Sequence, residues 1–284
     1  MDLQTLQYFC AVASEGSLSQ AAKKLHYAQS NLSTKIMQLE QEIGSPLFYR
    51  NNHGVTLTPK GELLLKYATN LLNLAEETMV AMKDDTDTQS TLKIGSMEST
   101  VITFLSEFLA RFHQNNPHIS VHVETGTTEN VLQKVLDYKL NGGFVAGPIR
   151  HPELFTKQVR TEKLCLIASK SLVPGGNALE MMKQPLLVFP HGCSYRKMLE
   201  QYMQDEGLAA HKIYEFNTLN AIFASVTAGL GTAMFPEACI QQYHQKESLT
   251  VLDIPEKYAF STTVFVYRKN CYLSNALHSF IDSI

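Results

Sequence analysis

Histidine, cysteine and serine side chains lie together at residues 191–194, and these residue types can supply a base and a nucleophile. Neighbours within one turn seldom reach the geometry that such a pair requires, and no serine stands in a G-x-S-x-G motif. The five cysteines are scattered without C-x-x-C spacing, so neither a metal site nor a disulfide is expected. An α/β-fold enzyme with an N-terminal helical appendage is therefore the alternative hypothesis only, and no cofactor is predicted.

Three hydroxyl-rich turns follow expected strands at residues 92–96, 119–124 and 186–189. They read Ser96-Met97-Glu98-Ser99-Thr100, Gly126-Thr127-Thr128 and Pro190-His191-Gly192-Cys193-Ser194-Tyr195-Arg196. Each opens an expected helix, where hydroxyls and free amides can hold an anion, although each can also be a capped helix start and nothing more. Three such turns in one domain favour a pocket for a small polar or anionic molecule. Glu98 adds negative charge there, so either it points away or the ligand carries a donor.

Short polar side chains also gather at the start of an expected helix over residues 28–42. The opposite face of that helix carries an apolar stripe of Leu32, Ile36, Leu39 and Ile43. Such polar groups near a helix N-terminus can reach base edges and phosphates in the major groove of DNA. The same pattern also describes an ordinary amphipathic helix with a solvated face. The polar group comprises Gln29, Ser30, Asn31, Ser33, Thr34 and Lys35.

The elements around this helix predict a helix-turn-helix with a wing. Ser17 and Gln20 have the spacing of a capping box at the start of the preceding helix. Gly44 suits the C-cap of the 28–42 helix. Residues 50–58 then read as a short hairpin with a polar, basic tip that includes Arg50, Asn52 and His53.

The sequence of residues 11–65 resembles, without a gap, the N-terminal winged helix-turn-helix of LysR-type transcriptional regulators. Its most specific pieces are LEQEIGSPLFYR and GVTLTPKG. In that family the position of Ala28 usually holds Ser or Thr, and the positions of Asn31 and Thr34 usually hold Ala and Arg. The first departure weakens the helix N-cap, and the others prevent an operator sequence from being carried over. The resemblance implies binding of double-stranded DNA by Gln29, Ser30, Asn31, Ser33, Thr34, Lys35, Arg50, Asn52 and His53.

A long helix is expected from Pro59 to Lys83, after the N-cap hydroxyl of Thr58. It is too long and too apolar to be covered by a small N-terminal domain, so a second copy of the chain is the expected partner, with packing on the C-terminal domain as the alternative. The resemblance likewise implies dimerisation, and a homodimer and a homotetramer both stay open. The apolar stripe comprises Leu64, Ala68, Leu71, Ala75, Thr78 and Met82, with Leu63, Tyr67, Asn70 and Leu74 alongside.

Beyond a polar hinge at residues 84–90, strands and helices alternate, with helices expected at residues 101–115 and 129–139 and a strand at residues 164–168. This alternation predicts an α/β architecture with a parallel sheet core. The resemblance implies two Rossmann-like subdomains, similar to periplasmic binding proteins, with an effector between them. The expected domains are 1–58, 59–90 and 91–284, with subdomain I at about 91–161 and 265–284 and subdomain II at about 162–264. The expected effector-binding residues are Ser96, Met97, Ser99, Thr100, Thr127, Thr128, Gly147, His191, Cys193, Ser194 and Thr218.

Charge and hydropathy limit the other classes of function. The net charge of −3 over 284 residues is not that of a generic polyanion binder. Residues 1–60 carry five cations against four carboxylates, so a field that attracts DNA must come from local placement of cations. No segment reaches the ~20 apolar residues of a membrane span, and no signal peptide is recognised, so a cytoplasmic location is expected. The N-terminal motif argues against the hypothesis of a solute-binding protein without a regulatory role.

Overall fold

A computed structural model describes residues 1–51, 54–83, 90–174, 176–208 and 212–284. The chain forms two compact units, one of residues 1–84 with 137–139 and one of residues 85–136 with 140–284. No helix in these described ranges is long and apolar enough to cross a membrane.

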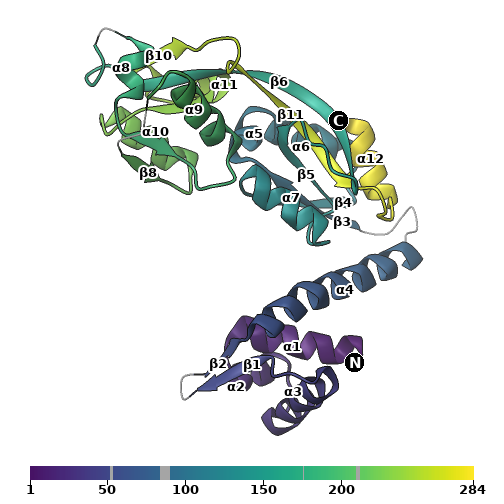
Figure 1. The fold of residues 1–284 in the computed structure, drawn as a ribbon. Helices are drawn as coiled ribbons and strands as arrows, with labels where there is room; N and C mark the ends of the chain where they lie inside the picture. Colours follow the sequence, from purple (N-terminus) through teal and green to yellow (C-terminus); the bar gives the residue numbers. More distant parts are fainter. Residues whose placement is uncertain (52–53, 84–89, 175, 209–211) are drawn as a thin grey trace. The chain divides into compact units, whose positions relative to one another are not determined.

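The N-terminal unit contains three short helices, a hairpin and one long helix (Figure 1). Its core is built from Leu6 and Phe9 of the first helix, Ile36 and Leu39 of the third, and Leu47 before the hairpin. These side chains are almost fully buried, as the predicted apolar stripe requires. The elements are α1 (Leu3–Glu15), α2 (Leu18–Lys24), α3 (Gln29–Ile43), β1 (Phe48–Asn51), β2 (Gly54–Leu57) and α4 (Pro59–Lys83).

The helix ends follow the predicted caps. Ser17 Oγ accepts a hydrogen bond from the Gln20 amide at 3.4 Å, and Gly44 ends α3 in the left-handed conformation with φ of 71°. Ala28 occupies the N-cap of α3 and gives no side-chain hydrogen bond, so the first amides of this helix lack the usual cap. Thr58 Oγ1 accepts from the Gly61 amide at 3.0 Å where α4 begins.

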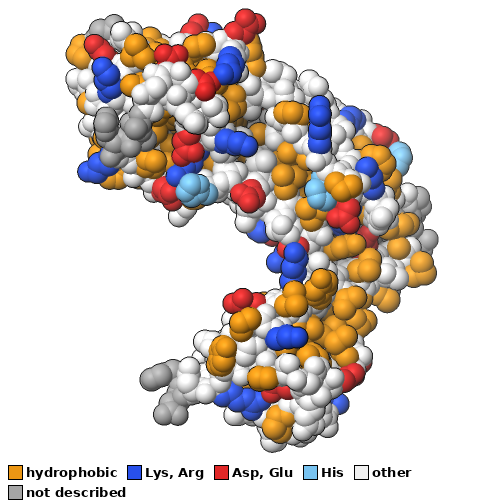
Figure 2. Space-filling model, in the orientation of Figure 1, with side chains coloured by type: hydrophobic (Ala, Val, Ile, Leu, Met, Phe, Trp, Pro, Cys, Tyr) orange, Lys and Arg blue, Asp and Glu red, His pale blue; other side chains and the backbone are white. Residues whose placement is uncertain are grey.

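Part of the apolar stripe of α4 is buried in the core of the N-terminal unit, and part is exposed. Ala68 is fully buried and Leu64 packs beside it against the core that α1 and α3 share. Packing within the chain therefore covers Ala68 fully and Leu64 only in part. Leu71 is 43% exposed. Figure 2 shows hydrophobic side chains gathered over α4, and the exposed ones are Leu63, Tyr67, Leu71, Leu74, Met79 and Met82.

The C-terminal unit is organised around a seven-stranded mixed sheet. The strand order is β10-β6-β11-β5-β3-β4, with β9 paired to β6. Only β3, β4 and β5 run parallel, and the other pairings are antiparallel. The predicted α/β architecture is confirmed, and the predicted parallel core corresponds to β3, β4 and β5, but the remaining strands pair antiparallel and make the sheet mixed. The strands are β3 (Ser90–Ser96), β4 (Ile119–Thr125), β5 (Gly142–Gly147), β6 (Leu154–Ser169), β9 (Ala233–Pro236), β10 (Leu249–Asp253) and β11 (Phe260–Arg268).

Three hydrophobic clusters of described residues lie against this sheet, and β6 and β11 run through both parts of the unit (Figure 1). The first contains a cluster of aromatic rings from Phe108, Phe144, Phe265 and Phe280. It is covered by α5 (Glu98–Thr100), the π-helical segment Val101–Leu105, α6 (Ser106–Asn115) and α12 (Asn275–Ser283). Helix α7 (Thr128–Leu136) packs through Val131 and Val135 against a separate cluster with Val145, Val264 and Val266.

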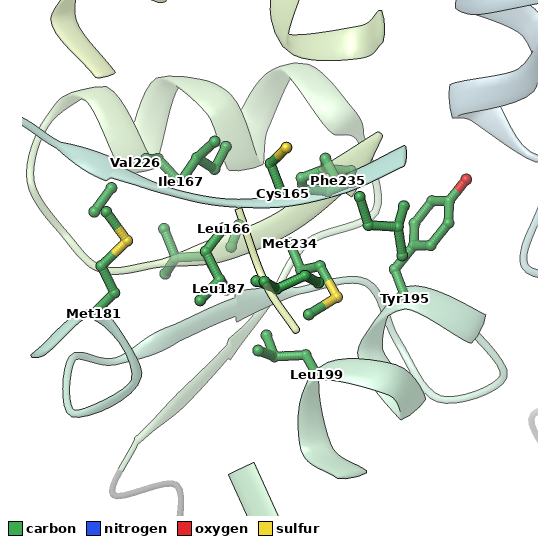
Figure 3. Close-up of a cluster of buried hydrophobic side chains, with 14 of the residues drawn as sticks. Cys165, Leu166, Ile167, Met181, Leu187, Tyr195, Leu199, Val226, Met234 and Phe235 are labelled. Carbon is green, nitrogen blue, oxygen red and sulfur yellow. The ribbon is translucent and has the colours of Figure 1, made fainter. Parts of the chain in front are cut away.

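The second core lies between β6, β9 and a small parallel sheet, and Figure 3 shows its packed side chains. That sheet pairs β7 (Leu186–Val188) with β8 (Ile213–Glu215). The surrounding helices are α8 (Ala178–Met182), α9 (Ser194–Asp205), α10 (Leu219–Thr227), α11 (Glu237–Gln242) and the 3-10 turn Lys246–Ser248.

Several helix and strand boundaries in this unit differ from the predicted ones. The helix predicted at residue 101 begins at Glu98, and the helix predicted to reach Lys139 ends at Leu136. The strand predicted at residues 164–168 is the end of the sixteen-residue β6. Ser90 begins β3 and does not belong to the hinge, while residues 84–89 lie outside the described residues.

Candidate functional site

A cavity of about 250 Å³ lies in the C-terminal unit where the turns after β3, β4 and β7 meet. The sequence named six of its lining residues as binding residues: Met97, Ser99, Thr127, Thr128, Cys193 and Ser194. The structure adds seven more, Glu98, Thr125, Gly126, Phe189, Pro190, Tyr195 and Asn217. The three hydroxyl-rich turns therefore share one cavity, because all of them follow strand ends on the same side of the fold.

Hydrogen bonds across the cavity join segments of the two cores. Ser99 Oγ and the Tyr195 hydroxyl are 3.0 Å apart, and both residues are buried. Glu98 Oε2 accepts from the backbone amide of Leu219, the first residue of α10, at 2.8 Å. These bonds connect residues about a hundred positions apart, so they depend on how the two parts of the unit are set against each other.

Tyr195 presents a polar atom to the cavity from an apolar support. Its ring packs against Phe235 in the second core, and Figure 3 shows the hydroxyl directed away from that cluster. Burial raises the pKa of Tyr195 well above its ordinary value, and the negative charge of Glu162 acts in the same direction. The hydroxyl is therefore protonated at neutral pH and available as a hydrogen-bond donor.

Ser194 supplies a second polar group. Its Oγ is buried and has no hydrogen-bond partner among the described residues. It stands at the first position of α9, where the free amides of a twelve-residue helix begin. A buried hydroxyl without a partner is costly, so a ligand atom that bonds to it is favoured.

The turn at residues 191–194 does not form a nucleophile and base. His191 is exposed, and its Nε2 lies 3.2 Å from a guanidinium nitrogen of Arg196. Burial raises the pKa of the Cys193 thiol, which keeps it protonated and poorly nucleophilic. No hydrogen bond connects His191 with Cys193 or Ser194 among the described residues.

Five of the expected binding residues do not line this cavity. Ser96 and Thr100 are fully buried, and Ser96 Oγ donates to the carbonyl of Met97. Thr218 caps α10 through the amide of Ala221, while its neighbour Asn217 lines the cavity. Gly147 and His191 line a neighbouring cavity of about 700 Å³, which shares Thr128, Cys193 and Ser194 with the first. Strand-end position alone could not distinguish side chains that turn inward from those that reach the cavity.

The polar face of α3 in the N-terminal unit is accessible. Gln29, Ser30, Asn31, Thr34 and Lys35 are exposed, and Ser33 is half-buried. Thr34 Oγ1 donates to the backbone carbonyl of Ser30 at 3.0 Å, which uses its proton within the helix. Asn52 and His53 lie outside the described residues.

Arg50 is held by a carboxylate. One of its guanidinium nitrogens lies 3.1 Å from Glu40 Oε2 on α3. The other oxygen of Glu40 accepts from the amides of Leu47 and Phe48, at 2.8 and 3.2 Å. The Arg50 side chain is 40% exposed, so its remaining donors can reach a phosphate only beside this carboxylate.

Two family models together match almost the whole chain. Residues 3–62 match the bacterial regulatory helix-turn-helix protein of the lysR family. Residues 85–284 match the LysR substrate binding domain. The chain belongs to the LysR family. It is thus a DNA-binding transcriptional regulator with an effector-binding domain, and the hypothesis of an enzyme is set aside.

Curated LysR-family relatives match over their full length. The chain is 40% identical over 281 residues to the HTH-type transcriptional regulator GltR of Bacillus subtilis, covering 99% of this chain and 95% of that protein. It is 39% identical over 284 residues to the regulator CzcR of Bacillus thuringiensis subsp. konkukian, covering 100% and 97%.

Solved structures show the same fold. Full-length CbnR in complex with its target DNA superposes with a TM-score of 0.73 at 21% identity, covering 100% of this chain and 99% of that one. Full-length OxyR from Pseudomonas aeruginosa gives a TM-score of 0.70 at 23% identity, covering 100% and 94%.

Proposed function

We propose that the cavity lined by Ser99, Thr127, Ser194 and Tyr195 is the effector site of this LysR-family regulator. The observation that carries the proposal is the convergence of three strand-end turns on one enclosed space with an unpartnered buried hydroxyl. A space of about 250 Å³ suits a small polar metabolite, since drug-sized ligands need about 300–1,000 Å³.

DNA contact is assigned to α3 and the hairpin that follows it. Gln29, Ser30 and Ser33 lie near the start of the helix, where they meet base edges, and Lys35 and Arg50 contact phosphates. The domains proposed are 1–58 for DNA binding, 59–89 for the linker helix and hinge, and 90–284 for the effector domain, with its two subdomains. A cytoplasmic location accords with this role.

The protein acts as a homodimer or homotetramer assembled through the exposed row of α4. Six large apolar side chains on one helix, Leu63, Tyr67, Leu71, Leu74, Met79 and Met82, form a row that water solvates poorly. A second copy of the helix would cover the row.

Regulation follows as a shift between two arrangements of the effector domain. The Ser99–Tyr195 and Glu98–Leu219 hydrogen bonds form only when the segments around the cavity are close together. A ligand that binds one arrangement more tightly changes the population of that arrangement by its difference in affinity. The paired DNA-binding domains then change their spacing on the operator.

Footprinting tests this function. Purified protein is mapped on the DNA upstream of its own and neighbouring genes, with and without candidate metabolites. A protected site whose length or strength changes with one metabolite is the expected result. Absence of any protected site would refute the assignment of operator binding to these regions.

A further inference from the structure

Glu98 is the one charged side chain among the described residues that line the effector cavity. It follows β3 at the start of α5, and its carboxylate is fixed by the hydrogen bond from the Leu219 amide. Only Oε2 takes part in that bond. Oε1 has no hydrogen bond to any described residue, so one carboxylate oxygen stays available at the cavity.

Among the residues that the structure describes, no lysine, arginine or histidine belongs to the lining. Arg196, which lines the neighbouring cavity, is bound by Glu200 and Glu215 at 2.8 and 2.7 Å. The Leu219 amide at the start of α10, which could have held an anion, is already taken by Glu98. A ligand with only negative charge would face this carboxylate in a partly dry space without a compensating cation, which is unfavourable.

The opposite part of the lining suits a carboxylate. Ser194 Oγ is buried and unpartnered among the described residues, and it stands where α9 begins. Cys193 and Ser194, the N-cap and first residue of α9, both line the cavity, so the start of this helix lies at the cavity. The cavity therefore has a negative group from α5 and a donor-rich group from α9.

We propose that the effector is a small zwitterion of the amino-acid type, with its ammonium bound by Glu98 and its carboxylate by Ser194 and the start of α9. This assignment rests on the proposed effector site. A zwitterion has no net charge, and its ammonium can donate a hydrogen bond to Glu98 Oε1, which accepts none from the described residues. A negatively charged effector, which the hydroxyl-rich turns alone suggested, is replaced by one that carries a cationic donor.

A purely structural role for Glu98 is the competing explanation. In that case the carboxylate would serve only to cap α10, where Thr218 already bonds the Ala221 amide. Glu98→Gln separates the two roles, because the amide oxygen of Gln still accepts from Leu219 while the charge is lost. Thermal unfolding of Glu98→Gln should match the wild type.

The test is calorimetric titration of the full-length protein with matched probes. One set contains the common amino acids, the second the same carbon skeletons without the amine, and the third the same skeletons without the carboxylate. At least one amino acid should bind wild type about tenfold or more tightly than both of its truncated analogues, because each analogue leaves a buried polar group unpaired. Glu98→Gln should lose that advantage over the analogue without the amine.

Glu107→Gln on the exposed face of α6 is the matched control and should bind like wild type. The assignment is overturned if no amino acid binds, if skeletons without the amine bind as tightly, or if Glu98→Gln retains full affinity and selectivity. A footprint that responds to a metabolite without an amine would overturn this assignment and leave the regulator function standing. A protein without operator footprints would instead refute the function proposed above.

Discussion

The buried hydroxyls of Ser99 and Tyr195, 3.0 Å apart, join two segments that lie 96 residues apart in the chain. Ser99 follows the first strand of the sheet, and Tyr195 lies in the first turn of α9 with its ring in the second core. Because both residues line the proposed effector cavity, the bond depends on how the two segments are arranged around it.

Tyr195→Phe should lower the free energy of unfolding by about 1–3 kcal/mol, since it leaves the buried Ser99 hydroxyl unpaired. Ser99→Ala should lower the free energy of unfolding by a similar amount, because it leaves the Tyr195 hydroxyl without a partner. The double variant should be less unstable than the sum of the two, by about 0.5–3 kcal/mol. Urea unfolding of the four proteins measures this coupling, and strict additivity would show that the two hydroxyls do not interact.

Lys35→Ala and Arg50→Ala should each weaken binding to all DNA sequences and reduce the slope of log affinity against log salt by about one. Gln29→Ala should instead reduce discrimination between operator and unrelated DNA, because a base contact carries sequence information. Fluorescence anisotropy over a series of salt concentrations checks both effects. Lys246→Ala, a change far along the chain in the effector domain, serves as control. Wild-type affinity in all three test variants would show that α3 and its hairpin do not contact the DNA.

Leu71→Glu should convert the oligomer to monomers. The side chain is 43% exposed in the single chain, so the change is tolerated there, but a partner helix would bury the new charge in an apolar seam. Sedimentation velocity at micromolar concentration gives the mass. Gln38→Glu on the exposed face of α3 controls for added charge. An intact oligomer of Leu71→Glu would place the assembly surface elsewhere.

Acid stability should depend on Asp205 in α9. Hydrogen bonds from Lys257, Tyr258 and Gln201, in that order of importance, lower the pKa of this carboxyl from 3.8 to about 2. A lowered folded-state pKa gives stabilisation that is complete above the unfolded value and is lost as the pH falls from about 4 to about 2. Asp205→Asn should therefore flatten the decline in unfolding free energy over that interval. A decline identical to that of wild type would exclude Asp205 as a source of the acid sensitivity.

The N-terminal unit was predictable because its signals are local. Ser17, Gly44 and the Thr58–Pro59 pair mark helix ends within a few residues of themselves, and the uncapped Ala28 is visible in the sequence and in the structure. Leu64 illustrates the limit of such signals. The stripe that contains it is apolar throughout, and only tertiary packing shows which part α1 covers.

The C-terminal unit was less predictable because its strands pair with distant partners. Residues 154–163 of β6 include Lys157, Arg160 and Glu162 and lack a strand pattern, yet they pair with β11, about a hundred residues later. Because β6 and β11 pair in antiparallel fashion, the sheet is mixed and not wholly parallel. The pairing of Tyr195 with Ser99 and of the Leu219 amide with Glu98 was not predictable for the same reason, since nothing near Ser99 or Glu98 in the sequence indicates these partners.

The most direct test of the account is the operator footprint of Ser99→Phe, with and without the metabolite that alters the wild-type footprint. A bulky ring at this position fills the cavity, while the helix that contacts DNA belongs to the other unit. The variant should protect the operator as wild type does, but its footprint should no longer change when the metabolite is added. Ser106→Phe, on the exposed side of α6, should respond normally. A full metabolite response in both Ser99→Phe and the equivalent Thr127→Phe would contradict the assignment of the effector site to this cavity.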